Sequence, residues 1–288
     1  MNVRKNLLVG AAALAGTAGF ASAQVVYGVT SNETLVTWNA GSPNNVTSGV
    51  ALSGFEQNET VRGIDFRPAT GELFAVGSFS NLYKIDTSSG AATRVGSGSF
   101  SPGLNGSSFG FDFNPTIDRI RLVSEVNQNM VLNPNDGSST AVTDLFYASG
   151  DVHEGIDPNV VASAYTNSFA GSTSTQLYGI DTGLDILVTQ ANSAGTLMTV
   201  GSLGEDLNDT ASFDIFSDGT SNIAYATVQD DTLARSTFWT IDLTTGQASI
   251  VGEIGGGAVI SAMAVTPAPA SFLALAGGGA LVGRRRRR

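Results

Sequence analysis

The sequence has 288 residues, of which 25 are Asp or Glu, 14 are Lys or Arg, one is His and none is Cys. Seven basic residues lie at the two ends, so the middle of the chain carries 25 acids against seven bases, a net charge of about −18 that disfavours nucleic-acid binding. The absence of Cys excludes disulfides, thiol nucleophiles and thiolate metal sites, and the 35 glycines with few charges indicate an all-β chain with many turns.

Residues 1–23 have the three parts of a secretory signal peptide. A positive segment with Arg4 and Lys5 is followed by an apolar run that ends at Phe20 and by small residues before Gln24. The apolar run is short for a bilayer span, which favours cleavage over an uncleaved anchor or a plain N-terminal helix. We therefore expect an exported protein, located in the cell envelope or outside the cell.

Between residues 24 and 265 two short patterns recur. The first ends in Asp or Asn after an apolar stretch, and its marker residues, separated by 47, 47, 48 and 61 residues, are Asn39, Asp86, Asn133, Asp181 and Asp242. The second is Gly-Ile-Asp-Phe at 63–66, Gly-Phe-Asp-Phe at 110–113 and Ser-Phe-Asp-Ile at 212–215. Because both patterns hold the same offsets, we interpret them as one repeat, whose period near 47 is typical of propeller blades.

Each repeat contains four short stretches of alternating apolar and polar residues bounded by turn residues. The clearest unit has strands expected at Val61–Phe66, Glu72–Gly77, Asn81–Asp86 and Ala91–Val95. Four such strands bury too little apolar surface alone, so the units must pack around an axis. The sequence predicts a five-bladed β-propeller, with an elongated β-sandwich as the alternative.

The first and last strands are expected to share one blade. The first unit has only three strands (Val25–Val29, Thr34–Trp38 and Val46–Leu52), and the last strand, Val259–Val265, has no partners after it. Pairing them closes the ring and removes the exposed edges. The long final interval predicts about seven extra residues in each of blades four and five, near Gly183–Ala194 and Ser217–Ser236.

Residues 266–288 form a C-terminal segment of Pro-Ala-Pro, an apolar run from Phe272 to Gly283 and five arginines. Such an apolar run is short for a span, and the arginines act as a positive stop, which suits transient membrane anchoring before processing. The segment resembles PEP-CTERM sorting signals, although Pro-Ala-Pro stands where Pro-Glu-Pro is usual. The resemblance implies an envelope sorting protease as a partner. The alternative is a solvated basic tail that binds anionic partners.

The repeat region itself resembles a known family. The carrying motifs are Gly-Ile-Asp-Phe-Arg-Pro-Ala-Thr-Gly at 63–71, Gly-Phe-Asp-Phe-Asn-Pro-Thr-Ile-Asp-Arg-Ile-Arg at 110–121 and Ala-Tyr-Thr-Asn-Ser-Phe at 164–169. They look like the bacterial exported domain-of-unknown-function 4394 family, over essentially all of residues 24–265. The resemblance implies a bacterial origin, export and a propeller-like fold, and it implies no activity.

Three aspartates of the second pattern are the candidate metal ligands. If Asp65, Asp112 and Asp214 lie on the innermost strands, their carboxylates converge near the axis and can bind calcium. By its spacing, Asn159 is expected at the same position in the third unit, and the closing strand has no acid there. The alternative is that each aspartate bonds to nearby backbone N–H groups or pairs with an arginine such as Arg67.

The turn motifs are interpreted as structural. In the segments 86–90, 133–137 and 242–246, an initial Asp or Asn can cap a turn that ends in a glycine with positive φ. A calcium loop is the alternative, but the distal Glu of the known acidic loop is missing. His153 is expected in a loop, because the chain lacks a second His for a zinc motif and a strained serine elbow.

Two functions remain open on the sequence alone. The first is a non-catalytic exported propeller that serves as a binding or surface-scaffold module and takes an extracellular ligand of carbohydrate or protein nature. The second is a secreted glycoside hydrolase that uses the channel carboxylates, which needs two carboxylates about 5 to 9.5 Å apart. Nothing in the sequence singles out a nucleophile and base pair, so we favour the binding module, with no cofactor besides calcium.

Overall fold

The computed structural model describes residues 24–230 and 232–268. The expected signal peptide (1–23) and all but the first three residues of the C-terminal segment (266–288) lie outside the described residues. Within them the chain forms twenty-one strands and two short 3₁₀ turns, η1 (Asn192–Ala194) and η2 (Gly255–Gly257). No helix in this described part is long and apolar enough to cross a membrane.

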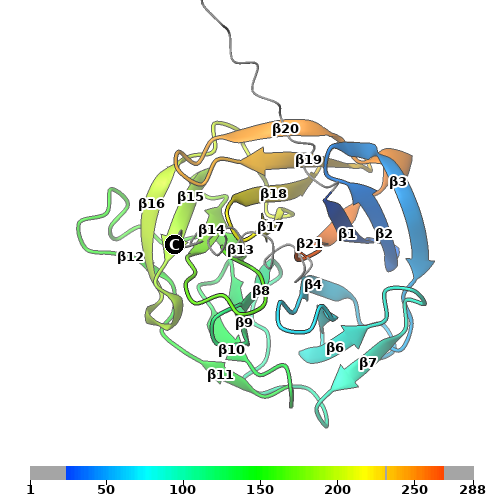
Figure 1. Ribbon diagram of the computed structural model, residues 1–288. Coiled ribbons are helices and arrows are strands. Elements are labelled where there is room, and N and C mark those ends of the chain that lie inside the picture. Colours follow the sequence, from blue (N-terminus) through cyan, green and yellow to red (C-terminus); the bar gives the residue numbers. More distant parts are fainter. Residues whose placement is uncertain (1–23, 231, 269–288) are drawn as a thin grey trace, which may run out of the picture.

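The strands form five sheets that stand around a common axis, as Figure 1 shows. Blade one contains, from the axis outward, β21 (Ile260–Val265), β1 (Val25–Thr30), β2 (Thr34–Asn39) and β3 (Ser42–Ala51). Blade two contains β4 (Val61–Phe66), β5 (Leu73–Gly77), β6 (Asn81–Ile85) and β7 (Ala92–Val95). Blade three contains β8 (Phe109–Asn114), β9 (Arg119–Ser124), β10 (Asn129–Leu132) and β11 (Ser139–Ala141).

The remaining two blades are built in the same way. Blade four contains β13 (Val160–Tyr165), β14 (Leu177–Asp181), β15 (Ile186–Gln190) and β16 (Thr196–Ser202), and the short β12 (Phe146–Tyr147) pairs parallel with β16 outside them. Blade five contains β17 (Ser212–Ser217), β18 (Asn222–Gln229), β19 (Ser236–Ile241) and β20 (Ala248–Glu253). The innermost strands β21, β4, β8, β13 and β17 contact one another in that ring order. The predicted five-bladed β-propeller is confirmed.

The ring is closed by the two ends of the repeat region. Strand β21 pairs antiparallel with β1, from Val26 opposite Val265 to Thr30 opposite Ile260. In Figure 1 the orange β21 lies directly beside the dark blue β1. The predicted pairing of the last strand with the first unit is therefore confirmed, and it protects one edge each of β1 and β21.

Small residues allow the inner strands to approach one another. A Cβ atom added to Gly63 would lie 2.6 Å from Cβ of Phe111, and one added to Gly110 would lie 2.5 Å from the backbone N of Ser163. In both cases the neighbour belongs to the inner strand of the next blade. This close approach explains why the second sequence pattern begins with glycine in blades two and three.

The hydrophobic core lies between the blades. The cluster between blades two and three joins Phe74 and Leu82 to Phe113 and Ile120, all of them buried. The rings of Phe74 and Phe113 meet edge to face, with their centroids 5.1 Å apart. Burial of one Phe side chain contributes about 2–3 kcal/mol to stability. Because these side chains are buried by packing against the next blade, each blade is stabilised mainly by contacts with its neighbours.

The turns between the third and fourth strands of the blades are capped as predicted. Asp86 Oδ1 accepts the backbone N–H groups two and three residues further on, at 2.9 and 3.0 Å. The side-chain oxygens of Asn133 and Asp242 cap their turns from the same position. Gly90 ends the first of these turns with a φ of +73°. The bonds to backbone N–H groups account for these side chains without a metal ion.

In blade four the first sequence pattern marks a different strand from the one that the repeat predicts. Asp181 was expected to follow a third strand, but Leu177–Asp181 forms β14, the second strand, and the third strand is β15. The connection from blade three to blade four spans 18 residues (142–159), against 13 (96–108) between blades two and three, because it includes β12.

Blades four and five are longer than the others, as predicted: from first to last strand they span 43 (160–202) and 42 residues (212–253), against 35 (61–95) and 33 (109–141) in blades two and three. In blade five the extra residues lie in the predicted region 217–236. In blade four they lie mainly in the loop 166–176 between β13 and β14, which corrects the predicted position near 183–194.

Candidate functional site

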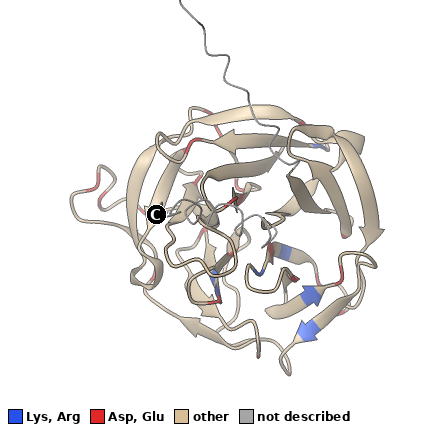
Figure 2. Ribbon diagram, in the orientation of Figure 1, with Lys and Arg blue, Asp and Glu red and all other residues tan. Residues whose placement is uncertain are grey.

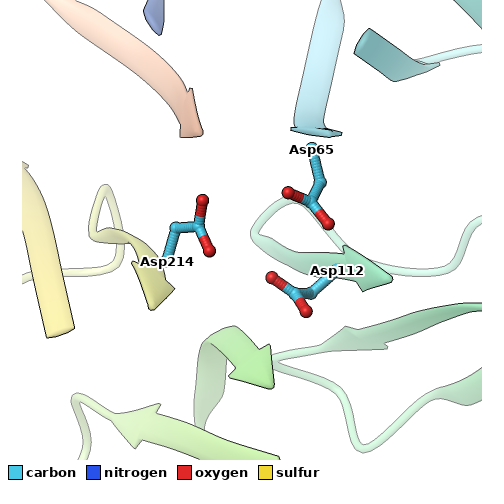
Figure 3. Close-up of side chains that lie close together, drawn as sticks. All are labelled: Asp65, Asp112 and Asp214. Atoms are coloured by element: carbon cyan, nitrogen blue, oxygen red, sulfur yellow. The ribbon is translucent and has the colours of Figure 1, made fainter. Parts of the chain in front are cut away.

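Three aspartates converge at the axis of the ring. Asp65, Asp112 and Asp214 lie on the inner strands β4, β8 and β17, as predicted, and their carboxylates turn toward one another in Figure 3. One oxygen of each lies within 4.8 Å of the others. The three residues are only 3 %, 1 % and 4 % exposed. The spacing of the second sequence pattern thus identified a real cluster of buried acids.

Each carboxylate also reaches the inner strand of the following blade. In every case one oxygen accepts a backbone N–H: Asp65 Oδ2 from Phe113 at 2.7 Å, Asp112 Oδ1 from Tyr165 at 3.0 Å, and Asp214 Oδ2 from Val265 at 2.6 Å. The recipient strands belong to blades three, four and one. The cluster therefore links neighbouring blades through charge-assisted hydrogen bonds.

Blades one and four carry alanine where the other blades carry aspartate. The bonded N–H groups of Tyr165 and Val265 directly follow Ala164 and Ala264 in the chain. Blades two and five, which follow these alanines around the ring, therefore receive no carboxylate from the preceding blade. There the N–H groups of Phe66 and Ile215 donate to the aspartate that directly precedes each of them in the chain, at 2.6 Å in both cases. Three carboxylates thus accept one backbone N–H from each of the five inner strands.

Asn159 is not a member of this cluster, which corrects the expectation from the repeat spacing. It lies just before β13, where its side chain donates to Thr182 and Asp209 and its backbone N–H donates to Asp181. The axial position of this blade is Ala164, five residues later. The extra residues that precede blade four account for the shift.

The cluster retains protons more strongly than ordinary carboxyl groups. Burial raises the pKa of Asp65 and of Asp112 well above the usual value, and the neighbouring carboxylates raise both further. Burial raises the pKa of Asp214 to about 6, against the opposing effect of its two backbone hydrogen bonds. The interaction of Asp112 with Asp214 raises the pKa of Asp112 and lowers that of Asp214. A proton retained by this pair is therefore favoured on Asp112, which accepts only one backbone N–H.

The same geometry is compatible with a cation. Calcium binds oxygen ligands at 2.3–2.6 Å, so one ion can touch three oxygens that lie within 4.8 Å of one another. The cluster would supply three of the six to eight ligands that calcium takes, and carboxylates are the chemistry that it prefers. Bonding to backbone N–H groups, the alternative from the sequence, is present, but the predicted pairing with arginine is not. Arg67 instead binds Asp118 of the next blade.

Two polar residues outside the axial cluster, Glu125 and His153, make local contacts. Glu125 caps the chain before β8 by accepting the N–H groups of Ser107 and Ser108. His153 lies in the loop after β12, as expected, with Nδ1 2.9 Å from Thr199 Oγ1. Thr199 Oγ1 also donates to Asp151 Oδ1 at 2.9 Å, and that oxygen lies 3.7 Å from His153 Nδ1. The hydroxyl and the carboxylate thus face the same ring nitrogen, whereas a catalytic triad places them on opposite nitrogens of the imidazole.

A cavity at one mouth of the channel was not anticipated from the sequence. It measures about 220 Å³ and lies where the inner strands begin, so Arg62, Phe109, Ser212 and Ser261 line it. On the first three of these strands the aspartate lies two or three residues further along. The sequence contains no periodic signal for this cavity, because its charged residues Arg62 and Asp209 stand at positions that the other blades do not repeat. The lining residues are far apart in the chain, and only the fold brings them together.

One protein family, described as a domain of unknown function (DUF4394), matches residues 34–264. No curated protein matches the chain. A chain from the nidogen–laminin complex is similar in structure, with a TM-score of 0.51 and 9 % identity, over 84 % of this chain and 98 % of that one. A protein of unknown function from Bacteroides thetaiotaomicron has a TM-score of 0.46 and 15 % identity, over 86 % of this chain and 68 % of the other. At such identities the structural likeness concerns the fold alone.

Proposed function

The chain belongs to the DUF4394 family, and from the geometry at its axis we propose that it is an exported, non-catalytic β-propeller that serves as a binding or scaffold module of the cell envelope. The ligand is extracellular, of carbohydrate or protein nature. A smaller binding site lies at the mouth of the channel. The axial carboxylates support this site by holding the blades in place.

The observation that carries the proposal is the use of the axial carboxylates. Three acids accept backbone N–H groups from all five inner strands, at 2.6 to 3.0 Å, and at most 4 % of each residue is exposed. A glycosidase needs two carboxylates that face a substrate in an open cleft. Acids that are buried and already bonded to the backbone suit a structural role better than proton transfer to a sugar.

We further propose that the cluster exchanges its protons for a calcium ion when calcium is abundant. The convergence of three oxygens within 4.8 Å and the raised pKa values support this, since like charges at such distances need either protons or a cation. In an exported protein, calcium would replace the protons and stabilise the closed ring.

Export and sorting are proposed from the sequence. The segment 1–23 supports secretion, and the segment 266–288 supports transient anchoring in a membrane and processing by an envelope sorting protease. A fusion that carries both segments can be followed by fractionation of the producing cells. Retention in the cytoplasm would contradict the proposal.

One experiment distinguishes the binding module from the alternative function, a glycoside hydrolase that uses the axial acids. Residues 24–268 are assayed against a panel of chromogenic glycosides and a glycan array, together with the Asp112→Asn variant. We expect binding without turnover, and no effect of the variant on binding. Turnover that Asp112→Asn abolishes, in a protein that still folds, would establish the hydrolase instead.

A further inference from the structure

The cavity at the mouth of the channel combines a polar lining with charges of both signs. Its lining residues come from blades one, two, three and five or the loops before them, and they include Arg62, Ser108, Phe109, Asp209, Gln229 and Ser261. Most of these side chains end in a hydroxyl, an amide or a charge. A volume of about 220 Å³ is enough for one small molecule and too small for a folded partner.

Arg62 provides the only positive charge of the lining. It is exposed at the start of β4, and within the described residues it forms no ion pair shorter than 4.0 Å. Its charge acts on Glu33, whose pKa is raised by burial and lowered by the backbone N–H of Val61 and by Arg62. The guanidinium therefore keeps donors available for a ligand, and a guanidinium binds carboxylates in a bidentate manner.

Asp209 provides the negative charge on the opposite wall. Its Oδ1 accepts hydrogen bonds from Asn159 Nδ2 at 2.8 Å and from Thr182 Oγ1 at 2.5 Å, which fixes the carboxylate between blades four and five. In a ring of five blades, the junction of blades four and five lies across the axis from blade two, where Arg62 stands. Oδ2 of Asp209 accepts no hydrogen bond among the described residues and can accept one from a ligand.

The rest of the lining favours a small polar ligand over a sugar ring. Ser108 and Gln229 add a hydroxyl and an amide group to the lining, whereas the apolar members Val61 and Ala211 are buried. Phe109, the one aromatic residue of the lining, is 9 % exposed and offers no broad face for stacking a pyranose. The strongly acidic surface repels a simple anion, and a simple cation would leave Arg62 unpaired.

We propose that this cavity binds a small zwitterion of the amino-acid class, with its carboxylate on Arg62 and its ammonium on Asp209. The proposal rests on the proposed binding function and goes beyond it, because this ligand is smaller than the carbohydrate or protein proposed for the module. A molecule with both charges in one small frame matches both walls, whereas a carboxylate or an amine alone matches only one.

Binding of the standard L-amino acids to residues 24–268 tests this, first by thermal shift at about 10 mM and then by calorimetry on the best ligand. We expect Arg62→Gln and Asp209→Asn each to raise Kd about tenfold, the effect of one charge-assisted hydrogen bond. Analogues of the best ligand without the ammonium or without the carboxylate should lose affinity by about the same factor. Arg94→Gln and Glu253→Gln, which remove one charge of each sign outside the cavity, should leave Kd within about twofold.

Three results would overturn the assignment: no saturable binding of any amino acid, equal affinity for a neutral hexose, or affinity that Arg62→Gln and Asp209→Asn leave unchanged. These outcomes are distinguishable from failure of the proposed function. A protein that binds glycans without turnover would keep the binding function and lose only the zwitterion. Turnover of a glycoside that depends on Asp112 would remove the binding function itself.

Discussion

The three axial aspartates differ in how many backbone N–H groups they accept. Asp65 and Asp214 use both oxygens, each bonded at 2.6 or 2.7 Å, whereas Asp112 accepts one N–H, at 3.0 Å. A carboxylate with two donors is stabilised in its charged form, and one with fewer donors is the better place for a proton. The cluster is therefore asymmetric, although its strands are related by the repeat.

This asymmetry predicts opposite effects of the same substitution. Asp112→Asn should leave the free energy of unfolding at pH 7 unchanged or raise it by about 1 kcal/mol, because Oδ1 can still accept the N–H of Tyr165 and the amide can donate to Asp214 in place of the proton. Asp65→Asn should lower it by about 2–3 kcal/mol, because the new NH₂ group faces the N–H of Phe66 or Phe113. Urea denaturation of both variants measures the difference. Equal losses would show that the proton is not held on Asp112.

At the scale of elements, the turns between third and fourth strands fasten each blade to the one before it. The Gly90 carbonyl accepts the N–H of Ser53 at 3.1 Å, and the N–H of Ala92 donates to the Ser53 carbonyl at 2.8 Å. This short parallel bridge joins blade two to the chain that leaves blade one. The turn glycine is thus required both for its φ and for this contact.

A pair of glycines separates these two requirements. Gly71 and Gly90 both have a φ of +73°, but a Cβ at Gly71 meets nothing within 4 Å, whereas one at Gly90 would lie 2.3 Å from the Ala51 carbonyl oxygen. Gly71→Ala should cost about 1 kcal/mol from backbone strain alone, and Gly90→Ala should cost at least about 2 kcal/mol because the blades must also separate. Thermal denaturation of the two variants compares them. Equal costs would mean that the contact between blades contributes nothing.

The same elements show what the sequence could predict. Blade number, ring closure, capped turns and the axial position of three aspartates followed from two patterns with a constant spacing, since strand alternation and turn residues are local signals. The phase of blade four could not be predicted, because Leu-Tyr-Gly-Ile-Asp at 177–181 fits a second strand as well as the third strand that Leu-Tyr-Lys-Ile-Asp forms at 82–86. Only pairing between strands decides between the two.

The mouth cavity could not be predicted for a different reason. Arg62 and Asp209 are far apart in the chain, and neither occupies a position that the other blades repeat with the same residue type. Six of the seven basic residues in the middle of the chain belong to blades two and three or their turns, as the blue segments of Figure 2 indicate. A charged residue that occurs in one blade only, such as Arg62, produces no periodic signal in the sequence. That Asp209 lies across the axis from it follows only from the order of the blades in the ring.

At the scale of the whole molecule, folding depends on the contact between the first and last strands of the propeller, β1 and β21. Strand β21 supplies the inner strand of blade one, and its Val265 N–H is one of the five that the axial carboxylates accept. A chain of residues 24–258 lacks this strand, whereas a chain of residues 24–268 retains it. We expect the longer chain to unfold in one cooperative transition and the shorter chain to lose that transition in calorimetry. A folded, cooperative 24–258 chain would show that closure is dispensable.

The charge state of the axis should govern how stability depends on pH. The pKa of Asp214 is about 6 in the folded protein, and those of Asp65 and Asp112 are also raised, against about 3.9 in an unfolded chain. A group with a raised pKa contributes stability that is complete below the unfolded value and is lost as pH rises through the folded value. Surface caps act in the other direction, because the hydrogen bonds that lower the pKa of Asp218 contribute stability above about pH 4 and lose it in acid.

The two effects together predict a maximum of stability between about pH 4 and 6 in the absence of divalent cations, with a loss of about 2–3 kcal/mol by pH 8. Because calcium would bind the folded cluster and not the unfolded chain, adding it at pH 8 should restore most of that loss, and it should do so less in Asp112→Asn. Urea midpoints of residues 24–268 with EDTA or calcium measure both effects. Stability that stays flat or rises from pH 5 to 8 in EDTA would contradict a protonated axis. If stability fell as predicted and calcium did not restore it, the axial carboxylates would be neutralised by protons alone. The hydrogen bonds of the protonated cluster would then connect the five inner strands without a metal ion.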